Sequence, residues 1–127
     1  MMHDPAPVAR PGRVLVVEDD VALRFVVSEV LRDGGLTVIE AASGDEALDY
    51  LRGDPHVDLV FTDVHMPGAT DGLALAARIH ETWPDIQVLL TSGRHHPDHP
   101  VPFIAKPYVF ASVLATVQTM LEGSDGE

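Results

Sequence analysis

The feature that most constrains this chain is the repeated alternation of short apolar runs with longer segments of helical periodicity. The first run, Arg13–Val17, is nearly continuous and rich in β-branched residues, which is typical of a strand covered on both faces. In the next segment apolar residues recur at helical spacing from Leu23 to Leu31, before Gly34 and Gly35. Five such alternations predict an α/β fold, a doubly wound parallel sheet of five strands with helices on both faces.

The other expected elements follow the same pattern. Ser43 and Glu46 form a capping box, since each side chain can satisfy a free backbone N–H at the start of a helix. Asp71 is expected to cap a helix that ends before Pro84, and an apolar stripe that begins at Phe110 predicts the last helix. The remaining strands are expected at residues 37–41, 58–62, 86–91 and 102–105.

The length of 127 residues suits one domain with a single core. Residues 1–12 are rich in proline and alanine and lack periodicity, so we expect a disordered tail there. The folded domain is expected over residues 13–122, and an acidic tail over residues 123–127.

The net charge and the cysteine content exclude several classes of function. A formal charge of −12, from twenty acidic and eight basic side chains, argues against direct binding to nucleic acid or to anionic membranes. No apolar run approaches the roughly 20 residues of a membrane span, and the first residues lack a signal-peptide pattern. Cysteine is absent, which excludes disulfides and thiolate metal sites. We therefore expect a cytoplasmic protein.

Polar side chains stand where four of the expected strands end, and functional groups of parallel α/β sheets gather at that edge. Glu18 and Asp19 follow the first strand, and Asp63 follows the third. Thr91 ends the fourth strand, and Lys106, the only lysine, follows the fifth. Converging carboxylates repel one another unless a cation joins them, and Mg²⁺ commonly binds one or two carboxylates. With an ammonium and a hydroxyl opposite, this set predicts a cradle for a phosphoryl group that a carboxylate oxygen accepts.

Each of these residue types also has an ordinary structural explanation. An acidic residue before a helix, such as Asp20, most often caps it, a Lys-Pro pair is commonly a turn, and threonine favours strands. These explanations fail jointly, because complementary chemistry from four strands meets at one edge.

Four blocks of the sequence, VLVVEDD, FTDVHMPG, LLTSG and FIAKPY, resemble the receiver domain of two-component response regulators. They occur in the same order as in that family, and the resemblance runs from about residue 13 to residue 121. It implies a flavodoxin-like strand order, 2-1-3-4-5. It also implies a signalling domain rather than a classical enzyme. Such a domain accepts a phosphoryl group from a histidine kinase or a histidine phosphotransfer protein, with Mg²⁺ bound, and promotes its own phosphoryl transfer and dephosphorylation.

The resemblance also implies a role for each residue at the strand ends. Asp63 would be the phosphoacceptor, Thr91 would hold a phosphoryl oxygen, and Lys106 would bridge the acceptor and the phosphoryl group. The implied metal ligands are Asp19 directly, Glu18 through water, Asp63, and the backbone carbonyl of His65.

The segment between Thr91 and Lys106 is shorter than the family usually has, contains three prolines and lacks an apolar stripe at helical spacing. The fourth helix is therefore expected to be shortened or missing. The family's switch pairs the threonine with an aromatic residue three before the lysine. Here the pair is Thr91 and Phe103, and the phenylalanine lacks a hydroxyl. Since the face that usually forms dimers includes the fourth helix, we expect a monomer or a non-standard dimer.

The main alternative is a pseudo-receiver, a protein-binding module that is never phosphorylated. A haloacid-dehalogenase-type phosphatase would carry a DxD motif after the first strand. A flavodoxin-like nucleotide or flavin binder needs a hydroxyl- and glycine-rich loop there, whereas this chain has Glu18 and Asp19. His95, His96 and His99 suggest either a transition-metal site or a polar loop stiffened by proline, and we favour the loop.

Overall fold

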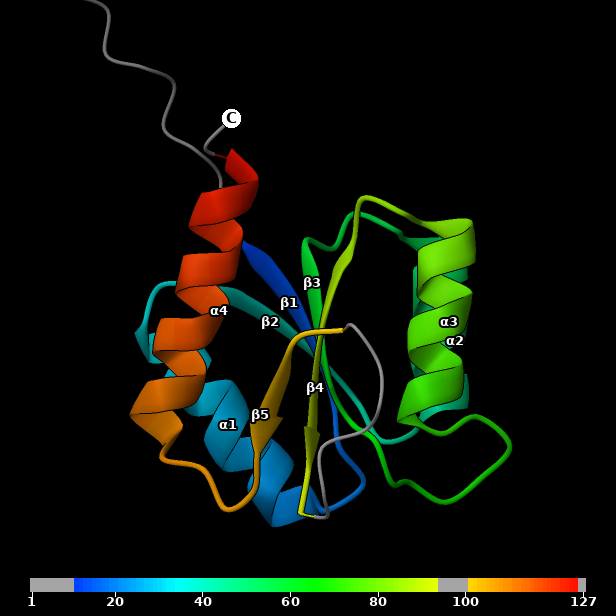
Figure 1. Ribbon diagram of the computed structural model, residues 1–127, viewed down its shortest axis with the longest axis horizontal. Coiled ribbons are helices and arrows are strands. Elements are labelled where there is room, and N and C mark those ends of the chain that lie inside the picture. Colours follow the sequence, from blue (N-terminus) through cyan, green and yellow to red (C-terminus); the bar gives the residue numbers. More distant parts are fainter. Residues whose placement is uncertain (1–10, 94–100, 126–127) are drawn as a thin grey trace, which may run out of the picture.

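The structure is a computed structural model, and it describes residues 11–93 and 101–125 (Figure 1). Its sheet has five parallel strands in the order β2-β1-β3-β4-β5, so the predicted α/β fold and strand order are confirmed. The strands are β1 (Arg13–Val17), β2 (Thr37–Ala41), β3 (Leu59–Asp63), β4 (Gln87–Ser92) and β5 (Phe103–Ala105). The helices are α1 (Val21–Asp33), α2 (Gly44–Gly53), α3 (Gly72–Thr82) and α4 (Phe110–Asp125).

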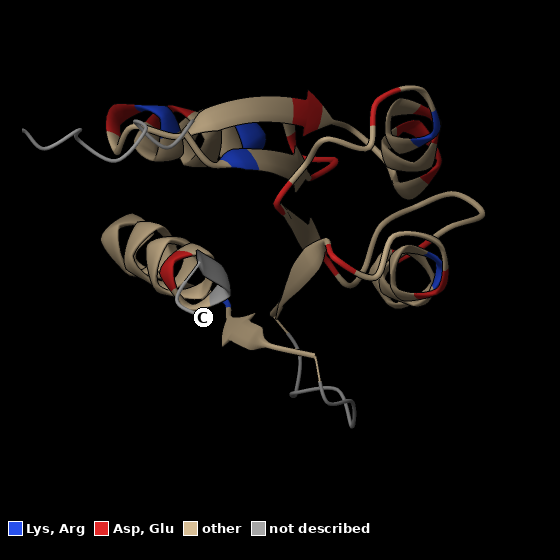
Figure 2. Ribbon diagram, turned by 90° about the horizontal axis from the view of Figure 1, so that it is seen from above, with Lys and Arg blue, Asp and Glu red and all other residues tan. Residues whose placement is uncertain are grey.

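The helices form one layer on each face of the sheet. Helices α1 and α4 lie on one face, and α2 and α3 lie on the other (Figures 1 and 2). Successive residues of β1 enter different core clusters: Leu15 and Val17 pack beneath α2 and α3, whereas Val14 and Val16 pack beneath α1 and α4. Both faces of β1 are therefore buried, which explains why its sequence is continuously apolar.

Side-chain caps start three of the described helices. Asp20, Ser43 and Asp71 each accept a hydrogen bond from the backbone N–H three residues later, at 3.0, 3.1 and 2.9 Å respectively. The expected caps at Ser43 and Asp71 are therefore confirmed, and Asp20 does act as a cap. The carboxylate of Glu46 accepts from the N–H of Ala42, one residue earlier than the capping box predicts.

The observed bounds of β3, β4 and β5 differ by one residue from those that their apolar runs predict. The third and fourth strands run to Asp63 and Ser92, and the fifth starts at Phe103. The parallel ladder between β3 and β4 continues through the pair Asp63 and Thr91, so both residues are part of the sheet. Strand pairing therefore fixes the backbone of both residues at the carboxyl ends of their strands, and neither residue lies in a loop.

The ends of the domain also differ from the expected boundaries. Helix α4 continues to Asp125, so residues 123–125, expected in the acidic tail, are helical. A glycine within a helix costs only about 1 kcal/mol relative to alanine, so Gly123 does not end it. Gly12, expected in the first tail, extends the sheet by accepting a hydrogen bond from the N–H of Thr37 at 2.9 Å. Residues 1–10 and 126–127 lie outside the described residues.

Ten residues, 93–102, connect β4 to β5. The described ranges contain four helices, and none of them lies between these two strands. This agrees with the predicted shortening or loss of the family's fourth helix, although residues 94–100 themselves, with His95, His96 and His99, lie outside the described part. Among the described helices, none combines the length and the apolar character needed to cross a membrane.

Helix α4 begins without a polar cap. The carbonyl of Val109 accepts hydrogen bonds from the N–H groups of Ser112 and Val113, at 2.8 and 3.2 Å, but its apolar side chain is 68 % exposed. The substitution Val109→Asp is expected to stabilise the fold by about 0.5–1 kcal/mol, because an aspartate there would accept from the free N–H groups. Thermal melts of this variant and of Val109→Ala measure the effect. A lower melting temperature for Val109→Asp than for Val109→Ala would contradict the prediction.

Candidate functional site

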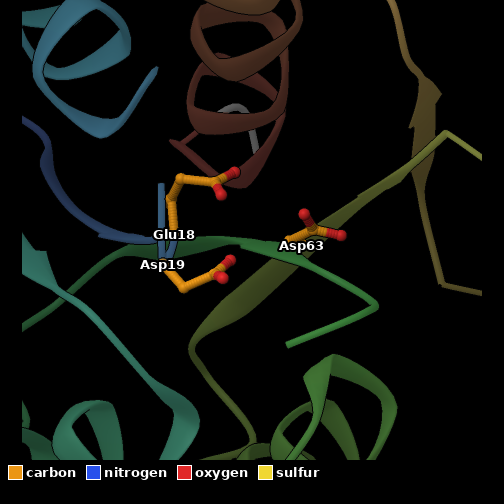
Figure 3. Close-up of side chains that lie close together, drawn as sticks. All are labelled: Glu18, Asp19 and Asp63. Atoms are coloured by element: carbon orange, nitrogen blue, oxygen red, sulfur yellow. The ribbon is translucent and has the colours of Figure 1, made fainter. Parts of the chain in front are cut away.

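Three carboxylates converge at the carboxyl ends of β1 and β3, where the strand order of the sheet reverses. Glu18 and Asp19 directly follow β1, and Asp63 is the last residue of β3. Figure 3 shows these side chains gathered at one edge of the sheet, and one oxygen from each lies within 4.8 Å of the others. The sequence prediction that these three residues meet is therefore confirmed.

Lys106 brings the one ammonium group to this cluster. Its Nζ donates to Oδ2 of Asp63 at 2.7 Å and lies 3.4 Å from Oε1 of Glu18. Glu18 and Asp63 are only 6 and 8 % exposed, whereas Asp19 is exposed. Three carboxylates face a single ammonium, so the described site has an excess of negative charge that suits a hard cation with oxygen ligands.

The loop after β3 fixes the orientation of the Asp63 carboxylate. The backbone N–H of His65 donates to Oδ1 at 3.0 Å, while Lys106 binds Oδ2, so each oxygen has a defined partner. His65 itself is exposed. Beyond it the chain turns at Gly68, whose φ of +103° is a left-handed conformation that glycine adopts without strain.

Thr91 lies beside Asp63 in the neighbouring strand and is only 1 % exposed. Its carbonyl accepts from the N–H of Val64 at 2.8 Å, but its hydroxyl has no hydrogen-bond partner among the described residues. Buried hydroxyls are nearly always hydrogen-bonded, because an unpaired one costs free energy. An unpaired hydroxyl next to a buried carboxylate and an ammonium fits a site built for an additional oxyanion.

Sequence reasoning missed two residues that position this site. Arg24, on the first turn of α1, donates to the carbonyl of Glu18 at 2.7 Å and lies 3.3 Å from the carboxylate of Glu40. It therefore links the acidic loop, Glu18 to Asp20, to β2. Its position four residues after the cap Asp20 is ordinary for a surface arginine, so the sequence carries no signal of this role.

Gly72, the second residue that was missed, starts α3 against the end of β3. Its N–H donates to the carbonyl of Val64 at 2.9 Å. A Cβ at this position would lie 2.1 Å from the carbonyl oxygen of Asp63 and 2.6 Å from Cα of Val64. Only glycine permits this approach, so the helix can support the backbone of Asp63 directly. The signal in the sequence is a glycine immediately after a helix cap, Asp71.

The pKa values of two site residues shift through their shared environment. Burial raises the pKa of Glu18 above its ordinary 4.5, and the N–H of Asp20 and the charge of Lys106 offset this only in part. Burial alone would lower the pKa of Lys106, but the hydrogen bond and charge of Asp63, with the charge of Glu18, raise it above 10.5.

Both raised pKa values make the fold less stable as the pH rises, in different pH ranges. The stabilising contribution of Lys106 is complete below pH 10.5 and is lost as the pH rises through its folded-state pKa. For Glu18 the folded state binds a proton more readily than the unfolded state, so its contribution decreases as the pH rises above 4.5. Ionised Glu18 is thus unfavourable in the absence of a further positive charge.

Phe103, the expected aromatic switch residue, lies on β5 beside Leu90 of β4. It is partly buried and packs on a small cluster formed by Val64, Ala76 and Leu90. This cluster directly adjoins the site, because Val64 follows Asp63 and Leu90 precedes Thr91.

The model of the family described as "Response regulator receiver domain" matches residues 14–109. The chain belongs to this family. This chain is 39 % identical over 121 residues to the sensor kinase CckA of Brucella abortus. The matched region covers 88 % of this chain and 13 % of CckA. This chain is also 32 % identical over 119 residues to the response regulator MprA of Mycolicibacterium vanbaalenii, covering 87 % of this chain and 51 % of MprA. The chain thus spans about half of MprA, and less of CckA.

Solved receiver domains share the same architecture. The crystal structure of the receiver domain from the hybrid histidine kinase CckA superposes with a TM-score of 0.77 at 35 % identity, covering 87 % of this chain and 99 % of that one. A receiver domain from Methanospirillum hungatei gives a TM-score of 0.82 at 21 % identity, with 91 and 98 % of the two chains covered, and this shows the fold alone. Receiver domains are signalling modules that partner with histidine kinases or phosphotransfer proteins and bind Mg²⁺ at an acidic pocket, and this chain has such an acidic cluster.

Proposed function

We propose that this receiver domain accepts a phosphoryl group on Asp63 from a histidine kinase or a histidine phosphotransfer protein, in a reaction that depends on Mg²⁺. The proposal rests on the groups that surround Asp63. Its carboxylate is oriented by Lys106 and by the N–H of His65, beside the buried, unpaired hydroxyl of Thr91. These groups form an oxyanion cradle around a nucleophile, with one position left for the oxyanion.

The acidic cluster is suited to hold the metal ion. Asp19 and Asp63 would bind it directly, Glu18 through water, and the backbone carbonyl of His65 would complete the protein ligands. Bound Mg²⁺ would supply positive charge to the phosphoryl oxygens during transfer. The excess of carboxylates over ammonium groups and the raised pKa of Glu18 support this assignment. A bound cation would offset the excess negative charge and lower the pKa of Glu18.

The protein side chains have distinct parts in the transfer. An oxygen of Asp63 forms a bond to phosphorus as the phosphorus–nitrogen bond of the donor histidine breaks, and the imidazole leaves with the bonding electrons. Lys106, now paired with Asp63, would also bind a phosphoryl oxygen and neutralise its charge. Thr91 would donate its hydroxyl proton in a hydrogen bond to another phosphoryl oxygen and so gain the partner that it lacks. A coupled movement of Thr91 and Phe103 remains a prediction.

Incubation with acetyl phosphate and Mg²⁺, followed by intact mass spectrometry, tests the proposal. We expect a mass increase of one phosphoryl group that requires the metal ion. A pseudo-receiver would give no increase. We do not favour that alternative, because each reactive position of the site is filled.

The contribution of Asp19 to metal binding gives a separate prediction. Asp19→Asn is expected to weaken Mg²⁺ binding by about tenfold or more, since it removes the charge of a direct ligand and even outer-shell changes cost that much. Asp20→Asn is the matched control, because it removes one adjacent charge but keeps a side chain that caps α1. Calorimetric titration compares the two variants. Equal affinities for Mg²⁺ would refute the assignment of Asp19.

Exposed apolar side chains around the site indicate where the donor protein docks. The large hydrophobic residues with high exposure in the described ranges are Val21, Phe25, Val26 and Val109. Three lie at the start of α1, directly after the acidic loop, and the fourth lies just after Lys106 and Pro107. Between these segments is a cavity of about 410 Å³, lined in part by Leu23, Tyr108 and Phe110. Lys106, which binds Asp63, also lines this cavity, so we propose that the donor covers this apolar surface.

Phe25→Ala is therefore expected to slow phosphorylation by a phosphohistidine donor protein by about tenfold or more, because interface aromatics commonly dominate binding. Phosphorylation by acetyl phosphate should not change. Arg78→Ala, an exposed change on α3, is the control. An equal slowing with both donors would mean that Phe25 supports the fold or the site instead.

A further inference from the structure

The loop that follows β3 joins the site to helix α3. It comprises residues 64–71 and lies at the end of the sheet where the carboxylates gather (Figure 1). Its second residue, His65, supplies the N–H that orients Oδ1 of Asp63, at 3.0 Å. The proposed Mg²⁺ site also uses the backbone carbonyl of His65. The geometry of the site therefore depends on how firmly this loop is held.

The first half of the loop is held by the sheet and the core. The N–H of Val64 donates to the carbonyl of Thr91 at 2.8 Å, and the buried side chain of Met66 packs in the core cluster beneath α2 and α3. Residues 67–69, by contrast, are exposed, so burial of their side chains does not fix them. The second half of the loop needs another attachment.

That attachment is a hydrogen bond to the first turn of α2. Oγ1 of Thr70 donates to Oδ1 of Asp45 at 2.6 Å, a short distance typical of a hydroxyl that donates to a carboxylate. Helix α2 follows β2, so it starts at the same edge of the sheet as the site, although Asp45 is distant from Thr70 in the sequence.

A close backbone approach at Gly44 brings the loop against α2 at the same point. A Cβ on Gly44 would lie 2.3 Å from the carbonyl oxygen of Thr70 and 2.9 Å from its Cγ2. Only glycine permits this approach. Two separate contacts with the start of α2, one through a side chain and one through the backbone, therefore converge on Thr70.

The hydrogen bond is better suited to positioning the loop than to stabilising the fold. Asp45 is exposed and Thr70 is half-buried, so water competes for both groups and the net gain in folding free energy is small. A loop that is held at both ends nevertheless has fewer conformations to lose when a ligand binds to it.

We propose that Asp45 is a positioning residue of the phosphotransfer site. By holding Thr70 it restricts the positions of His65, and through His65 it orients the carboxylate of Asp63 and the carbonyl expected to bind Mg²⁺. This inference rests on the proposed function, because it concerns the same site.

The first test is calorimetric titration with Mg²⁺. Asp45→Ala and Thr70→Val are each expected to weaken Mg²⁺ binding by about threefold, less than the roughly tenfold or greater cost of losing a group that contacts a metal ligand directly. Both changes remove the same hydrogen bond, so the double variant should bind no more weakly than either single variant. Effects that add in the double variant would overturn the proposal.

Two further variants separate the hydrogen bond from the charge of Asp45. Asp45→Asn removes the charge but keeps an oxygen that can accept from Thr70, so it should bind Mg²⁺ almost as the wild-type protein does. Asp49→Ala removes a carboxylate one turn later on α2, where it pairs with Arg52 at 3.0 Å, and should also have little effect. If either variant weakens binding as much as Asp45→Ala, charge is the cause and the proposal is overturned.

Hydrogen exchange at the backbone amide of His65, followed by NMR without metal ion or phosphodonor, gives an independent readout. We expect faster exchange in Asp45→Ala and Thr70→Val than in the wild-type protein, and wild-type exchange in Asp45→Asn. Unchanged exchange in Asp45→Ala would overturn the proposal. Failure of the proposed function has a different signature, because the wild-type protein itself would then gain no phosphoryl group. Thermal melts check that each variant is folded.

Discussion

Replacing Asp63 with asparagine is expected to abolish the mass gain from acetyl phosphate while leaving the fold intact. The amide has almost the same shape as the carboxylate, but it is neutral and is a far weaker nucleophile toward phosphorus. Glu18 still offers a carboxylate near Lys106, so the ammonium group keeps a partner. The change also relieves the repulsion among the three clustered carboxylates.

Intact mass spectrometry and a thermal melt should be run on Asp63→Asn together with Asp20→Asn. The control makes the same chemical change nearby and retains a capping side chain, so it should be phosphorylated like the wild-type protein. If Asp63→Asn still gains a phosphoryl group at the wild-type rate, the acceptor is another residue. If it fails to fold, the carboxylate has a structural role that its hydrogen bonds do not explain.

The second large effect is expected at a glycine. Gly72→Ala should destabilise the fold by about 3 kcal/mol or more, because the new methyl group would meet backbone atoms of Asp63 and Val64 that cannot rotate away. Relief requires the start of α3 to move from the end of β3, and that movement would also displace Asp63, the proposed phosphoacceptor. We therefore expect slower phosphorylation in the fraction that remains folded.

Gly53→Ala is the matched control for this prediction. Gly53 ends α2, has no atom within 4 Å of the position that a Cβ would take, and does not have a positive φ. Alanine should thus stabilise the fold there by up to about 1 kcal/mol, from its higher helix propensity. Urea unfolding of both variants measures the difference. Equal stability of Gly72→Ala and the wild-type protein would show that the contact between α3 and β3 is loose.

The residues that could be predicted from the sequence are those whose position follows from the order of the elements. Glu18, Asp63 and Lys106 stand at strand ends, and parallel strands bring their carboxyl ends to one edge whatever the details of packing. The same logic gives the fold, because continuous apolar strands alternating with helices have few arrangements that bury both faces of a sheet.

The features that could not be predicted depend on distances between elements. The role of Gly72 follows from how closely one backbone approaches another, and that of Arg24 follows from a carbonyl six residues earlier in the chain. Strand ends were displaced because an apolar run carries no mark of where pairing stops, as at Asp63.

The ion pair between Lys106 and Asp63 can be followed by chemical labelling of the lysine amine. Lys106 is the only lysine, so acylating reagents that react with side-chain amines have a single target. Such reagents need the unprotonated amine, and the carboxylates around Lys106 raise its pKa, so its labelling should be slow. Neutralising Asp63 lowers that pKa and speeds the labelling. The acylation rate of Lys106 is thus expected to report the charge state of Asp63 and Glu18.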